Sequence, residues 1–249
     1  MVLAIARTGS SYLSRLLHRK GVIRCFDEVF DPGRFQVPKW FVGDDETALR
    51  HERDTDPIAF LERLYGPGAG APVVGFKLFP RHNDAVMAHV LEDTAIRKLV
   101  LYRENILASY SSVLIARETG LYMHHSTDAE PVAQVKVRFD PHDFEAFHDR
   151  YAGWFRSVFR SIAASGQVCR PIEYCQLTEK ALIGGLLAFL GVEPDTYEPG
   201  SRSLKLNPTD ILSRFSNPEA AHAFLVERDR LSWSHESKTS WSSHLAHAA

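Results

Sequence analysis

The stretch VLAIARTGSSYLSRLL, residues 2–17, decides the fold prediction. Residues 2–6 form an apolar run typical of a buried strand, and residues 7–11 form a short polar turn with one glycine. Leucines at positions 13, 16 and 17 then recur at helical spacing. A strand, a tight loop and a helix in this order are the layout of a phosphate-binding loop, because the free N–H groups and the dipole of a helix N-terminus attract anions.

Apolar strands alternate with amphipathic helices along the rest of the chain. Strands are predicted at residues 73–79, 98–103 and 169–177, and helices at 57–66, 83–93, 105–120, 142–164 and 180–192. Such alternation favours a parallel sheet that is covered on both sides. We therefore predict an α/β fold with a P-loop-like parallel β-sheet flanked by helices on both faces.

The 249 residues, which contain no internal repeat, are predicted to form a single domain, residues 1–249. Two loop-rich segments are expected within it, near residues 31–56 and 121–142. The Ser- and His-rich tail from about residue 234 is expected to be loose.

Composition and charge exclude several classes of protein. A net charge of −2 gives no global attraction to nucleic acid. The three cysteines include no CxxC pair, so the sequence indicates neither a disulfide scaffold nor a zinc site, and a reducing cytoplasm is expected. No apolar run approaches the roughly 20 residues of a membrane span. Met1 leads directly into the first predicted strand, so we expect no signal peptide.

The first loop departs from the loop of ATP-hydrolysing enzymes in two ways. No lysine follows its glycine, and the strand at 98–103 ends in Arg103, where an aspartate that holds Mg²⁺ would be expected. Arg7 instead supplies a cation before Gly9, and hydroxyl groups follow at Ser10 and Ser11. The pattern predicts a site for a phosphate-sized anion that is handled without Mg²⁺. The alternative is a plain strand-to-helix turn capped by Ser10, with Arg7 in solvent.

Four stretches together resemble the sulfotransferases that use 3′-phosphoadenylyl sulfate (PAPS). They are ARTGSSYLSRLL, LYRENILASYSSVLIARETG, FDEVF, and IEYCQL followed by LLAFLGV. The resemblance is strongest to the bacterial carbohydrate branch, which includes trehalose and nodulation-factor sulfotransferases. It extends from residue 2 to about residue 217 and depends on the order and spacing of all four stretches.

The resemblance implies two anion sites for PAPS and for its product, adenosine 3′,5′-bisphosphate (PAP). The implied 5′-phosphosulfate site consists of Arg7, Thr8, Gly9, Ser10 and Ser11, with Tyr12 near the adenine. The implied 3′-phosphate site consists of Arg103 and Ser111, with Tyr174 as a further adenine contact. Since parallel strands end at one edge of a sheet, we expect Arg7 and Arg103 to lie on the same edge.

The resemblance also implies candidates for the catalytic groups. The animal enzymes use a histidine as the base, but the comparable run here, FKLFP, has none. An acid after the first helix serves instead in the carbohydrate branch, and Glu28 fits that position better than Asp27. His82 is a third candidate for the base. Lys77 is expected to stabilise the transferred charge, and Arg7 to contact the bridging oxygen of the donor.

The acceptor is expected to be a hydroxyl of a carbohydrate, a glycolipid or a small metabolite. The loop-rich segments are expected to line its pocket, and Trp40, Phe41 and Tyr122 are aromatic candidates for stacking. Arg202 and Lys205 could reach the 3′-phosphate, and the resemblance implies a possible homodimer. The alternatives are a P-loop-type kinase and a non-catalytic nucleotide- or glycan-binding protein on the same fold.

Overall fold

Four parallel strands form the central sheet in the order β4–β1–β5–β6. The computed structural model describes residues 1–19, 21–37, 41, 45–66, 70–122, 135–193 and 207–236. The strands are β1 (Val2–Ala4), β2 (Ile23–Cys25), β3 (Val73–Gly75), β4 (Lys77–Leu78), β5 (Lys98–Tyr102) and β6 (Cys169–Glu173). The helices are α1 (Ser10–Leu17), α3 (Glu46–Thr55), α4 (Pro57–Tyr65), α5 (Asp84–Glu92), α6 (Ile106–Thr119), α7 (Pro141–Ala164), α8 (Lys180–Leu190) and α9 (Pro218–Glu227). Short 3₁₀ helices are η2 (Tyr174–Thr178), η3 (Leu212–Arg214) and η4 (Leu231–Ser234).

Strand β1 lies between β4 and β5 and is parallel to both. The chain therefore crosses over β1 between its second and third strands in this sheet, which makes the end of β1 a topological switch point. Ligands of open α/β sheets bind at such points, outside the carboxyl ends of the strands. The loop at residues 7–9 occupies this position.

Strand β2 brings two acidic residues alongside β4. It pairs in parallel with β3, and the chain continues from β3 through Phe76 into β4. The pairing extends beyond β2, because the Lys77 N–H group donates to the Asp27 carbonyl at 3.1 Å. Asp27 and Glu28 therefore lie next to Lys77.

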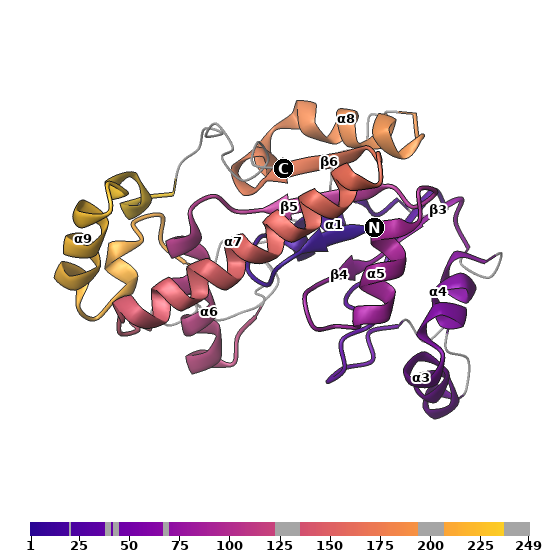
Figure 1. Cartoon of the computed structure of the whole chain (residues 1–249), viewed down its shortest axis with the longest axis horizontal. Coiled ribbons are helices and arrows are strands. Elements are labelled where there is room, and N and C mark those ends of the chain that lie inside the picture. The colour runs from indigo at the N-terminus through magenta and orange to yellow at the C-terminus, as the bar shows by residue number, and fades with distance from the viewer. Residues whose placement is uncertain are drawn as a thin grey trace.

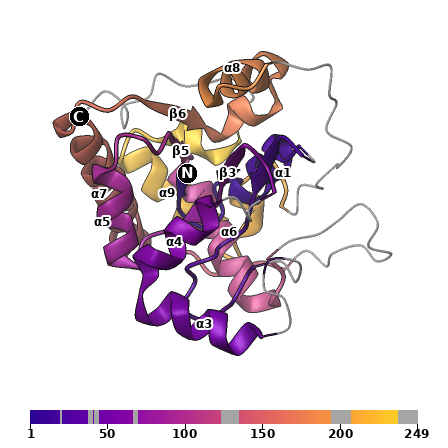
Figure 2. The same ribbon diagram turned by 90° about the vertical axis from the view of Figure 1, so that its right-hand side faces the viewer.

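Side chains of β1 alternate between the two faces of the central sheet. Val2 and Ala4 belong to an apolar cluster with Leu13 and Leu17 of α1, whereas Leu3 belongs to a second cluster. Helices α1 and α8 cover the first face, and α5 and α7 cover the second (Figure 2). Helix α7 runs diagonally across the sheet, and α9 lies beyond one end of it (Figure 1).

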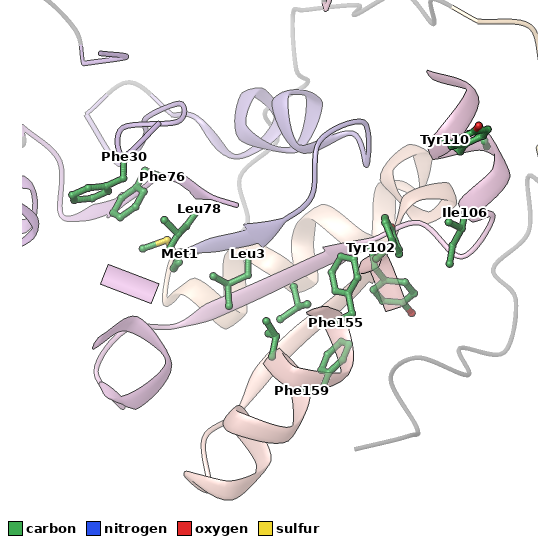
Figure 3. Packing of buried hydrophobic residues seen from close by; sticks show 14 of the residues in the cluster. Met1, Leu3, Phe30, Phe76, Leu78, Tyr102, Ile106, Tyr110, Phe155 and Phe159 are labelled. Carbon is green, nitrogen blue, oxygen red and sulfur yellow. The ribbon is translucent and has the colours of Figure 1, made fainter. Parts of the chain in front are cut away.

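The second cluster fixes the carboxyl end of β5. Leu3 and Leu78 lie on neighbouring strands, and the Tyr102 ring packs against Phe155 and Phe159 of α7 with centroids 6.2 and 6.4 Å away (Figure 3). Close packing of this kind leaves few alternative positions for the backbone. The point at which the chain leaves β5 is thereby well defined.

The predicted α/β fold, with a P-loop-like parallel sheet and helices on both faces, is confirmed. The prediction of a loop-rich segment at residues 31–56 is wrong for its second half, because residues 46–55 form the helix α3. Asp45 accepts from the Ala48 N–H group at 2.9 Å and caps α3. Leu49 is the only buried apolar residue of this helix, so the sequence has too few periodic apolar residues to predict it.

Two predicted strands differ from those observed. The strand at 169–177 ends at Glu173, because the Glu173 carboxylate accepts from the Cys175 N–H group at 2.5 Å and starts η2. The strand at 73–79 is divided at Phe76, because its two parts pair with different strands.

Residues 234–236, where the tail was expected to be loose, are bonded to the rest of the chain: the Ile211 N–H group donates to the Ser234 carbonyl at 2.8 Å, and the Glu236 N–H group donates to the Thr209 carbonyl at 2.9 Å. Residues 123–134 and 237–249 lie outside the described residues. None of the helices in the described part of the chain combines the length and apolar character needed to cross a membrane.

Candidate anion-binding and catalytic site

The loop after β1 presents the open N-terminus of α1. Thr8 is buried, and its hydroxyl donates to the Ile5 carbonyl at 2.7 Å, which closes the turn. Gly9 starts the helix with a φ of +86°. Within the described part of the chain no side chain caps the first turn of α1, and that turn contains no acidic residue. Its N–H groups and the hydroxyl groups of Ser10 and Ser11 can therefore serve an anion.

Gly9 is required at this turn for two reasons. A φ of +86° is strained for a residue with a side chain. A Cβ atom would also lie 2.8 Å from Cδ1 of Leu177 and 2.9 Å from Cδ2 of Tyr174. The loop thus packs directly against η2, which bounds the anion site on one side.

We expect Gly9→Ala to lower the free energy of unfolding by about 2–5 kcal/mol, from backbone strain and overpacking together. Gly120→Ala is the matched control, since Gly120 has a φ of +69° but no atom of a described residue within 4 Å of the added Cβ. It should cost only the strain, about 1–2 kcal/mol. Urea denaturation measures both values, and equal losses would contradict the close packing of the loop.

Arg7 lies at the end of β1 and is held by α6. Its Nε group donates to Oγ of Ser112 at 2.9 Å, and Nη1 donates to the Tyr122 carbonyl. Asn207 donates to the same Ser112 oxygen at 3.0 Å. Burial and the neighbouring Arg103 guanidinium lower the pKa of Arg7. Since the two positive charges destabilise each other, the binding of an anion between or beside the two arginines is favoured.

Arg103 leaves the end of β5, next to Arg7. It is buried, and its Nη1 donates to the Arg7 carbonyl at 3.1 Å. The guanidinium lies 4.1 Å from the centre of the Tyr174 ring, within the range of a cation–π contact. The Tyr151 hydroxyl accepts from the Arg103 N–H group at 2.7 Å and donates to its carbonyl at 3.1 Å. The two predicted arginines therefore meet at one edge of the sheet.

Ser111 contacts Arg214, a residue that the sequence does not single out. Nη1 of Arg214 donates to Oγ of Ser111 at 3.1 Å. Burial lowers the pKa of Arg214, and the Glu236 carboxylate partly offsets that effect. Arg103 and Arg214 both donate to Oε1 of Glu236, the latter at 2.5 Å. Arg103, Ser111, Arg214 and Glu236 thus form one buried group.

Lys77 joins the first loop to the acidic residues after β2. Its side chain is only 2% exposed and reaches Oγ of Ser11 at 2.9 Å, Oδ1 of Asp27 at 2.9 Å and Oε1 of Glu28 at 3.1 Å. These acceptors use all three N–H donors of an ammonium group. A rigid, buried cation therefore lies between the anion loop and the candidate base.

His82 lies on the other side of Glu28. Its Nε2 is 3.9 Å from Oε2 of Glu28, and its Nδ1 accepts from the Phe79 N–H group at 3.3 Å. In a neutral ring this bond assigns the proton to Nε2, which faces Glu28. Burial lowers the pKa of His82, so the neutral ring is favoured at pH 7.

Glu28, Asp31 and His82 also form a candidate metal site. One ligand atom from each lies within 4.8 Å of the others. The Lys77 ammonium already contacts Glu28, however, and its positive charge opposes a dication at that carboxylate. The charge of Lys77 therefore disfavours a metal ion at this cluster.

The remaining predicted residues lie in different places. Tyr12 packs partly buried against the cluster under α1, whereas Phe41 packs in the protein core against Phe26 and Phe60. Tyr122 is 46% exposed beside Arg7, and Arg34 lies 5.5 Å from the centre of its ring. Trp40, Arg202 and Lys205 lie outside the described residues.

No protein-family model and no curated protein matches this sequence. Among solved structures, the chain is similar to a sulfotransferase from Alicyclobacillus acidocaldarius, with 16% sequence identity and a TM-score of 0.46, over 92% of this chain and 93% of that one. It is also similar to the sulfotransferase domain of the olefin synthase from Synechococcus PCC 7002, with 13% identity and a TM-score of 0.37, over 99% and 90% of the two chains.

Proposed function

We propose that this chain is a PAPS-dependent sulfotransferase that acts on a hydroxyl of a carbohydrate, a glycolipid or a small metabolite. One observation carries the proposal: Arg7 and Arg103 lie side by side at the carboxyl ends of adjacent strands, next to the uncapped N-terminus of α1. PAPS has a phosphosulfate at one end of its nucleoside and a separate phosphate at the other. It therefore needs two neighbouring anion sites.

The 5′-phosphosulfate would be held by the first loop. Arg7, Thr8 and Gly9 shape this loop, and the first N–H and hydroxyl groups of α1 come from Ser10 and Ser11. These donors are fixed before any ligand arrives, so little reorganisation accompanies charge development on the leaving phosphate. Bound PAPS would supply the sulfuryl group, and the residues of this chain would orient it.

The 3′-phosphate would be held by Arg103, Ser111 and Arg214. The Glu236 carboxylate supports this assignment, because it is an anion already held by both guanidinium groups. Arginine pairs of this kind match the three acceptor oxygens of a phosphate monoester. Tyr174, stacked on Arg103, and Tyr12 are the proposed neighbours of the adenine.

Glu28 is the proposed base for the acceptor hydroxyl. In the reaction, a bond forms between the acceptor oxygen and sulfur, and the bond from sulfur to the phosphate oxygen breaks. The electron pair stays on the phosphate, and the acceptor proton goes to the Glu28 carboxylate. Lys77 contacts both Ser11 and Glu28, so its ammonium can stabilise charge on the sulfuryl oxygens while it orients the base.

A metal-dependent kinase is the second candidate, and the Glu28, Asp31 and His82 cluster is the observation that favours it. The position after β5, where such enzymes hold Mg²⁺ with an aspartate, is occupied by Arg103. Lys77 further opposes a dication at Glu28. These charges favour the metal-free sulfuryl transfer.

A transfer assay with isotopically labelled PAPS and a library of hydroxyl acceptors tests the proposal. We expect labelled product and one PAP for each sulfate transferred, in the presence of EDTA. Phosphate transfer from Mg²⁺-ATP to the same library would support the kinase instead. Binding of PAP without turnover on any acceptor would favour a non-catalytic binding protein.

A further inference from the structure

A single carboxylate oxygen holds two buried guanidinium groups at the edge of the sheet. Oε1 of Glu236 accepts from both Arg103 and Arg214, and the three side chains are 5%, 6% and 0% exposed, respectively. One negative charge thus faces two positive charges in a poorly solvated place, with Arg7 as a third cation nearby. An unbalanced buried charge is costly, so this group favours an anion of higher charge.

A phosphate monoester matches these cations better than a carboxylate does. It carries close to two negative charges at neutral pH and offers three acceptor oxygens. Ser111 adds a hydroxyl group within the same cluster, already bonded to Arg214 at 3.1 Å. Glu236 therefore occupies a site whose charge and donors suit a phosphate.

The backbone around Glu236 is anchored, whereas its side chain ends in the cluster. Its N–H group donates to the Thr209 carbonyl at 2.9 Å, and Asn105 donates to the carbonyls of Trp233 and His235 at 3.1 Å each. Rotation about the side-chain bonds of Glu236 is enough to withdraw the carboxylate while these backbone bonds remain.

We propose that Glu236 is an internal competitor that occupies the 3′-phosphate site and must be displaced when the donor binds. The inference rests on the proposed function, because that function assigns a 3′-phosphate to Arg103 and Arg214. The apparent affinity for PAP is then reduced by the fraction of molecules in which the carboxylate is withdrawn. The segment 231–236, which carries Glu236, thereby affects the affinity for the product PAP.

The test compares the wild-type chain with Glu236→Gln, which removes the charge and keeps the shape. Calorimetry measures the affinity for PAP and for adenosine 5′-monophosphate (AMP), which lacks the 3′-phosphate. Thermal unfolding with and without inorganic phosphate measures occupation of the site independently of the nucleoside. Glu227→Gln is the matched control, since Glu227 is 74% exposed and lies on α9. Glu236→Asp, which keeps the charge but shortens the side chain, serves if the glutamine variant does not fold.

We expect Glu236→Gln to bind PAP about tenfold more tightly than the wild type, a change of about 1.4 kcal/mol. AMP affinity should stay unchanged, inorganic phosphate should raise the melting temperature of the variant more than that of the wild type, and Glu227→Gln should behave as the wild type. Glu236→Asp should give a smaller increase in PAP affinity than Glu236→Gln. Equal or weaker PAP binding by the Glu236 variants would overturn the inference while leaving the proposed function intact. If inorganic phosphate stabilised Glu236→Gln more than the wild type but neither protein bound PAP more tightly than AMP, Glu236 would still be a competitor for phosphate and the proposed function would be wrong.

Discussion

Replacing Arg103 with alanine should weaken PAP binding by about 100-fold. Arg103 supplies a buried, pre-oriented guanidinium to the proposed 3′-phosphate site. Loss of a charge-assisted hydrogen bond of this kind costs about 1.5–3 kcal/mol, and each 1.4 kcal/mol is a factor of ten in affinity. Calorimetric titration with PAP measures the change.

Two comparisons separate this effect from general damage to the fold. AMP, which lacks the 3′-phosphate, should bind the Arg103 variant within about threefold of the wild type, because its phosphate uses the first loop. Arg228→Ala, on an exposed arginine that pairs with Glu145, should leave both affinities unchanged. If PAP and AMP weakened equally in Arg103→Ala, the assignment of Arg103 to the 3′-phosphate would be wrong.

Replacing Glu28 with glutamine should lower turnover about 1,000-fold, since proton transfer by a positioned base contributes about 10²–10⁴-fold. PAP affinity should be unchanged, because Lys77 lies between Glu28 and Ser11 of the anion loop. Single-turnover transfer from PAPS measures the rate, and calorimetry with PAP measures the affinity.

The neighbouring candidates provide the controls for Glu28. His82→Asn and Asp27→Asn should each lower turnover by no more than about tenfold, because His82 contacts only the far oxygen of Glu28 and Asp27 is more than half exposed. A larger loss in His82→Asn than in Glu28→Gln would transfer the role of base to the histidine.

Local patterns in the sequence predict the sheet and predict that Arg7 and Arg103 lie close together. The run at residues 2–17 indicates a strand, a loop and a helix, and the strand that leads to Arg103 is apolar from Leu99 to Tyr102. Because parallel strands end at a common edge, both arginines were expected there without any knowledge of long-range contacts. Ser11, Glu28 and Lys77 were also candidates, but their contacts depend on the pairing of β2 with β3.

The rest of the site depends on contacts between distant parts of the chain. Arg214 reaches Ser111 across 103 residues, and Glu236 reaches Arg103 across 133. The sequence around Arg214, ILSRFS, offers one hint, a charged residue close to three apolar ones. Glu236 stands in a polar stretch, so nothing nearby distinguishes it from a solvated carboxylate.

Titration of the wild-type chain with PAP in EDTA tests most directly whether two cationic strand ends bind the bisphosphate without metal. We predict saturable binding of one PAP per chain, unchanged by added Mg²⁺ and at least about 100-fold tighter than that of AMP, the factor expected for the Arg103 contact alone. Binding that requires Mg²⁺, or equal affinity for PAP and AMP, would contradict this account.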